Sequence, residues 1–116
     1  MKLSARSDEE ILQIVTPLMD NLMEGSTEID FEKHTRDFSS RIKNHLNPEK
    51  LRVMCEGYQA TWGIFQAREF VSLFRRGDSV AVIWKQFCSK VTDEFVAEAV
   101  FKEENGKVAV DHAFVF

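Results

Sequence analysis

The sequence predicts an α+β fold in which three N-terminal helices pack on a curved, four-stranded antiparallel sheet. Apolar residues recur at helical spacing up to about residue 63, and beyond it they form short runs or alternate with polar residues. Turn-forming sequences, Asn105-Gly106 above all, separate these later runs. A chain of 116 residues suits one core, so we expect a single domain over 1–116, helical at about 8–63 and stranded at about 64–116.

The helix boundaries follow from capping and breaking residues. Ser7 can cap the first helix while Glu10 reaches back to it. Pro17 should kink or split this helix, and Gly25 should end it. A second helix is expected from Asp30 to about Leu46.

The third helix should begin at Asn47, a cap, with Pro48 in its first turn, and end at Gly63.

Four strands are expected at about 66–75, 80–89, 94–103 and 108–116. Asn105-Gly106 favours a two-residue type I′ turn, because both central residues of that turn need positive φ. This turn pairs Glu104 with Lys107, Phe101 with Val110 and Ala99 with His112. A four-residue turn before it would place Trp84 beside Ala99.

Alternate residues of a strand point to opposite faces, so this register divides the sheet. The inner face, toward the helices, should carry Trp84, Gln86, Phe101, His112 and Phe114. The outer face should carry Asp111 and an apolar set: Phe70, Phe74, Ile83, Phe87, Val96 and Val100. The neighbours Asp111 and His112 therefore diverge, and form no catalytic dyad unless a β-bulge intervenes.

The stretches "LNPEKLRVMCEGYQATWGIF" and "GKVAVDHAFVF" supply a helix cap, a helix stop and a final hairpin. With the predicted architecture, the chain resembles the cystatin-like cone of the nuclear transport factor 2-like superfamily, and within it a bacterial family of uncharacterised small domains. That superfamily includes ketosteroid isomerase, scytalone dehydratase and many non-catalytic binding and dimerisation domains. The isomerase resemblance implies a cavity Asp and a Tyr. Asp111 is expected to face away, however, and only Tyr58 could approach the cavity.

Several classes of function are disfavoured. A net charge of −4 without a basic cluster argues against nucleic-acid binding. No apolar stretch reaches the length of a membrane span, and "MKLSARSDEE" lacks a signal-peptide core, so we expect a cytoplasmic protein. The histidines form no metal-binding motif, and Cys55 and Cys88 suggest buried, reduced thiols. We expect neither a metal nor a cofactor.

The candidate site is an aromatic-lined cavity formed by His112, Gln86, Tyr58, Trp84, Phe101 and Phe114. A desolvated His112 could transfer protons; alternatively it is a hydrogen-bonded core histidine. Gln86 and Tyr58 could orient a ligand, or could simply satisfy their own packing and hydrogen bonding. His34 and His45 are interpreted as structural.

We therefore expect a non-catalytic domain that binds an apolar small molecule or mediates dimerisation. The apolar outer face favours a homodimer through Phe70, Phe74, Ile83, Phe87, Val96 and Val100. The alternative is a small isomerase-, dehydratase- or hydrolase-like enzyme that uses His112 as general acid or base. A third reading is a structural dimer with no pocket.

Overall fold

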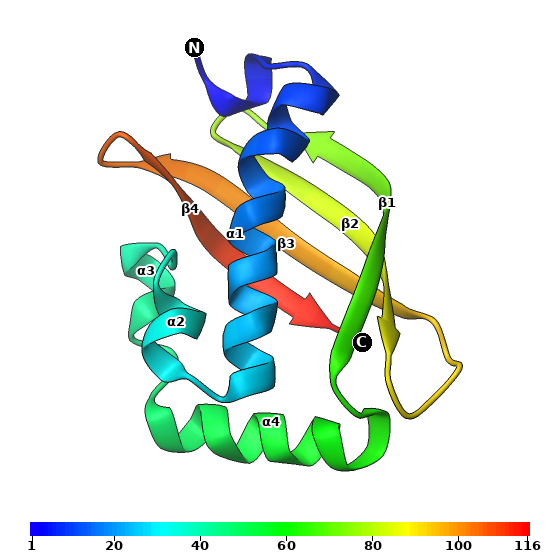
Figure 1. Cartoon of the computed structure of the whole chain (residues 1–116). Helices are drawn as coiled ribbons and strands as arrows, with labels where there is room; N and C mark the ends of the chain where they lie inside the picture. Colours follow the sequence, from blue (N-terminus) through cyan, green and yellow to red (C-terminus); the bar gives the residue numbers. More distant parts are fainter.

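A computed structural model describes all residues, 1–116 (Figure 1). After a 3₁₀ turn at Leu3–Ala5 come four α-helices, one more than expected: α1 (Asp8–Glu28), α2 (Phe31–Thr35), α3 (Ser40–Lys43) and α4 (Pro48–Trp62). The strands β1 (Phe65–Arg75), β2 (Ser79–Cys88), β3 (Phe95–Glu104) and β4 (Lys107–Val115) form an antiparallel sheet in the order of the chain. The predicted α+β architecture is confirmed.

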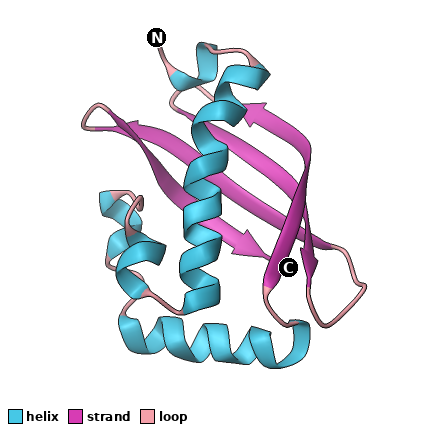
Figure 2. Cartoon of the chain, in the orientation of Figure 1, coloured by secondary structure: helices cyan, strands magenta, loops and turns pink.

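The helices lie on one side of the sheet and leave its other side uncovered (Figure 2). Helix α1 runs along the sheet, α4 crosses one end, α2 packs against α1, and α3 lies next to β4 (Figure 1). The core forms between α1 and the inner face of the sheet, where Ile11, Val15, Val82, Ala99 and Phe101 have no exposed surface. None of the helices combines the length and apolar character needed to cross a membrane.

Helix α1 begins as predicted, with a capping box between Ser7 and Glu10. It then continues through Pro17 and past Gly25, and ends where Ile29 adopts a left-handed conformation with φ 53°. Gly25 has another role: a Cβ added there would lie 2.5 Å from the backbone nitrogen of His34. The missing side chain therefore lets α2 pack directly against α1.

The predicted second helix is interrupted. Its middle, at Phe38, makes a bridge to Val110 on the free edge of β4. Ser39 donates a backbone hydrogen bond to the Val110 carbonyl, and the Val110 amide donates one to the carbonyl of Asp37. Backbone groups engaged with a strand cannot also form helical bonds, so the segment splits into α2 and α3.

The Asn105-Gly106 turn has positive φ at both residues, 52° and 78°, and the pairs Glu104–Lys107 and Phe101–Val110 form as predicted. A β-bulge at Asp111 then shifts the register, so that His112 pairs with Val100 and Phe114 with Glu98. The predicted inward orientation of His112 and Phe114 is therefore wrong. Both lie on the outer face.

Strand β1 carries two further register shifts, one between Phe65 and Arg68 and one between Phe70 and Ser72. They place Phe70 opposite Trp84, on the inner face, so its predicted outward orientation is also wrong. The pairing of β2 with β3 differs from expectation by two residues, with Trp84 opposite Ala97. A shift of two preserves the faces, and the other predicted outer-face residues lie there: Phe74, Ile83, Phe87, Val96 and Val100.

Candidate functional site

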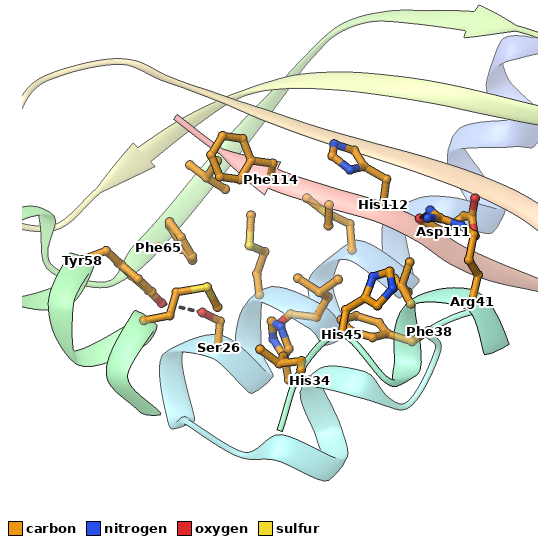
Figure 3. A pocket seen from close by; sticks show the side chains of 18 of the residues that line it. Ser26, His34, Phe38, Arg41, His45, Tyr58, Phe65, Asp111, His112 and Phe114 are labelled. Carbon is orange, nitrogen blue, oxygen red and sulfur yellow. Dashed lines mark hydrogen bonds and ion pairs between the residues drawn. The ribbon is translucent and has the colours of Figure 1, made fainter. Parts of the chain in front are cut away.

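A cavity of about 550 Å³ lies between the helices and the last residues of β4 (Figure 3). Thirteen of its nineteen lining residues are hydrophobic. Helix α1 supplies Met19, Leu22 and Met23, and α4 supplies Met54 and Trp62. The wall is completed by Phe38, Phe65 and the residues from Asp111 to Val115. The opening is marked by the lining residues that are exposed, which are Arg41, His45, Met54, His112 and Phe114.

His34 is the buried histidine of this cavity, with 7% of its surface exposed. Its Nδ1 lies 3.0 Å from the carbonyl oxygen of Leu22. Because a carbonyl only accepts hydrogen bonds, Nδ1 carries a proton. Burial lowers the pKa of His34 below 6.5, and the bond to Leu22 only partly opposes this effect. The ring is therefore neutral at neutral pH, and Nε2 carries a lone pair.

A second polar part of the cavity wall is a hydrogen-bonded cluster that joins α1 to α4. The hydroxyl of Tyr58 lies 2.6 Å from the Ser26 hydroxyl, and Ser26 also contacts the Cys55 sulfur at 3.4 Å. The amide of Gln59 donates to the Tyr58 oxygen at 3.3 Å. Burial raises the pKa of Tyr58. This phenol therefore stays protonated and remains a hydrogen-bond donor as well as an acceptor.

Asp111 lies at the opening and is held by three side chains. The Ser39 hydroxyl donates to its carboxylate at 2.6 Å, Arg41 Nε donates at 3.1 Å, and Lys102 Nζ lies 3.5 Å away. Arg41 also donates to the Asp111 carbonyl. Burial alone would raise the pKa of Asp111, but the bonds from Arg41 and Ser39 outweigh it and the pKa is lowered below 3.8. The carboxylate is ionised and committed to these partners.

His112 is turned away from the helical wall (Figure 3). Its Nε2 lies 2.6 Å from the carboxylate of Glu98, and 44% of its side chain is exposed. Although a bulge occurs at Asp111, the two neighbours therefore bind different partners and form no dyad. His112 therefore lies at the exposed opening of the cavity and not in its buried part, and its Nε2 is engaged with Glu98.

The remaining predicted site residues divide into two groups. Tyr58 and Phe114 line the cavity, Phe114 at its exposed opening. Trp84 and Phe101 lie instead in the core, where their rings meet edge to face at 6.4 Å between centroids. Gln86 is fully buried, and its amide donates to the carbonyls of Gln66 and Phe87, both at 2.9 Å. It holds the irregular start of β1 and does not line the cavity.

Sequence reasoning missed His34, Ser26 and the methionines as cavity residues. His34 was expected to pack between helices, because it shares an apolar stripe with Phe31 and Phe38. The stripe is real, since the rings of His34 and Phe38 lie 5.5 Å apart. The available signal was Gly25, which falls inside a helical run and marks the close approach of another segment.

No protein-family model matches the chain, and no curated protein matches it in sequence. Solved structures do share its architecture. A protein from Thiobacillus denitrificans, named as a calcium/calmodulin-dependent protein kinase type II association domain, has a TM-score of 0.60 at 11% identity, over 84% of this chain and 89% of its own.

A nuclear transport factor 2-like protein of unknown function from Pseudomonas putida has a TM-score of 0.58 at 12% identity, over 95% of this chain and 88% of its own. A SEC-C motif protein from Rhodopseudomonas palustris has a TM-score of 0.52 at 10% identity, over 89% of both chains. At these identities the likeness concerns the fold alone. The chain has the nuclear transport factor 2-like α+β cone.

Proposed function

We propose that this chain binds a small, mainly apolar organic molecule in the cavity between its helices and β4. The observation that carries the proposal is the cavity itself: about 550 Å³, with a largely hydrophobic wall and a few polar groups at defined places. Binding sites for organic ligands have this volume and this composition. An apolar molecule gains free energy in such a site because it leaves water.

The wall suits a molecule with a ring. Phe38, Trp62 and Phe65 offer aromatic faces or edges to a bound molecule. Met19, Met23 and Met54 add unbranched, polarisable side chains that adapt to ligands of different shapes. No charged group lies deep in this cavity, since Arg41 and Asp111 are near its opening and bind each other. A neutral ligand is therefore favoured over an ion.

Calorimetric titration with naphthalene tests the proposal. We expect saturable one-to-one binding to the unaltered chain. Ala113→Phe, which places a ring in the cavity wall, should abolish binding while the protein remains folded. Absence of binding to the unaltered chain, or equal binding to the filled variant, would contradict the proposal.

A second proposal, a homodimer through the outer face of the sheet, is supported by the exposure of apolar residues there. Phe74, Phe114 and Phe116 are each more than half exposed, and Ile83 and Val100 lie half-buried between them. Glu98 lies between Ile83 and Phe114 on this face, but exposed apolar residues gathered on one side of a sheet are typical of a protein interface. A second copy would cover it with the same residues, as a two-fold interface requires.

Sedimentation of the purified chain tests this second proposal. We expect a dimer, and we expect Ile83→Glu, in the middle of the face, to yield monomers. The matched control is Val53→Glu, which changes a residue of α4 that is 57% exposed and lies off the sheet. A monomeric unaltered chain, or equal effects of the two variants, would exclude the outer face as a dimer interface.

A further inference from the structure

We propose that the cavity selects a neutral ring compound that carries a hydroxyl group, and that His34 Nε2 accepts the hydrogen bond of that hydroxyl. The inference rests on the proposed function and names the class of ligand. It comes from the hydrogen-bonding capacity that the cavity leaves unused.

Two polar side chains of the cavity wall are buried, Ser26 and His34. Ser26 is bonded to Tyr58 at 2.6 Å and also contacts the Cys55 sulfur. His34 is bonded only through Nδ1, at 3.0 Å from the Leu22 carbonyl, and its Nε2 has no partner within the chain. Because His34 lines the cavity, this free acceptor can take a hydrogen bond from a ligand, and a ligand without a donor forgoes that bond.

The identity of the missing partner follows from the tautomer. The bond to the Leu22 carbonyl places the ring proton on Nδ1, which leaves Nε2 as an acceptor. The ligand must therefore bring a donor. An ammonium group would donate, but it would enter an apolar wall without a counter-charge, which is unfavourable. A hydroxyl is neutral and donates one hydrogen bond, so it matches this site.

The position of His34 is fixed, as selectivity requires. Its backbone lies against Gly25, where no side chain separates the two helices. Its ring also contacts Phe38 edge to face at 5.5 Å between centroids. The ring therefore has a defined place in the cavity wall, next to the aromatic side chain of Phe38 (Figure 3). A ring compound whose hydroxyl reaches His34 would satisfy both features.

A matched pair of probes tests the inference: 2-naphthol, which can donate, and 2-methoxynaphthalene, which cannot. Near neutral pH we expect the unaltered chain to bind 2-naphthol about fivefold more tightly, the value of one net hydrogen bond. The preference should vanish in His34→Phe. It should persist in Glu56→Gln, which changes an exposed residue of α4 that does not line the cavity.

An NMR measurement on the unaltered chain gives a second test, which does not require any variant to fold. In the unaltered chain, the ¹⁵N resonance of His34 Nε2 should shift when 2-naphthol binds and stay unchanged with 2-methoxynaphthalene. Equal affinities of the two probes would overturn the inference and leave the proposed function standing. A preference that survives His34→Phe would also overturn it. Failure of both probes to bind would overturn the proposed function itself.

Discussion

His112 and Glu98 form a hydrogen bond on the outer face of the sheet, with 2.6 Å between Nε2 and the carboxylate oxygen. The bond exists because a β-bulge at Asp111 shifts the register of β4 by one residue. Without the bulge, His112 would point toward the helices. The bulge therefore removes His112 from the interior and leaves His34, on α2, as the buried histidine of the cavity.

Asp111 should stabilise the bulge. We expect Asp111→Asn to lower the free energy of unfolding by about 1–3 kcal/mol, because charge-assisted bonds from Ser39, Arg41 and Lys102 are weakened. Denaturant unfolding measures the change. The control is Glu56→Gln, which disrupts an exposed pair with Arg52 and should cost less than about 0.5 kcal/mol.

The contribution of Asp111 has a defined pH dependence. Its pKa is lowered in the folded chain below the ordinary 3.8, so its stabilisation is present above 3.8 and lost as the pH falls through the folded-state value. The difference between the unaltered chain and Asp111→Asn should shrink over that acid range. A difference independent of pH would show that the charge is not what stabilises the bulge.

Gly25 and Gly57 provide a matched pair of helical glycines. A Cβ at Gly25 would lie 2.5 Å from the His34 nitrogen, whereas a Cβ at Gly57 meets nothing within 4 Å. Gly25→Ala should lower the free energy of unfolding by about 1–3 kcal/mol through overpacking. Gly57→Ala should raise it by about 0.5–1 kcal/mol, because alanine favours a helix. Denaturant unfolding measures both changes, and equal signs would contradict this packing of α1 on α2.

Mild acid should weaken the fold through His34. Burial lowers its pKa below the ordinary 6.5, so the unfolded chain takes up a proton before the folded one does. Stability is therefore fully present above 6.5 and is lost as the pH falls toward the folded-state pKa. Unfolding measured at about pH 7 and about pH 5.5 should show a smaller decrease for His34→Phe than for the unaltered chain. An equal decrease in both would contradict this assignment.

The two cysteines should be unreactive in the folded chain. Cys55 and Cys88 are both free and buried, and burial raises the pKa of each thiol, which disfavours the reactive thiolate. A thiol reagent should label neither cysteine in native buffer and both in denaturant. Rapid labelling of either one without denaturant would show that its surroundings open.

The sequence could predict the architecture because its signals are local. Ser7 with Glu10, Asn47 with Pro48, and Asn105 with Gly106 each act within a few residues, and each has its predicted structure. Register was predictable only as far as the turn that sets it, from Glu104 to Phe101. The predicted pairing of β2 with β3 was wrong by two residues, but it still assigned the side chains of these strands to the correct faces. A shift of two residues returns every side chain to the same face.

The site was less predictable because it depends on interactions across the fold. Nothing adjacent to Asp111 marks a bulge: its partners Ser39 and Arg41 come from a segment about seventy residues earlier. The same segment bridges to Val110, which interrupts a run of residues that otherwise favours a helix. His34 becomes a cavity residue only through that interruption and through the close approach at Gly25.

The central claim, that the cavity holds a small organic molecule, is tested most directly by the methyl resonances of the four methionines. Met19, Met23 and Met54 line the cavity, whereas Met1 is 83% exposed and lies outside it. On addition of naphthalene, we predict saturable shifts of Met19 and Met23 with no change at Met1. Unchanged spectra, or shifts that include Met1 and never saturate, would contradict the claim.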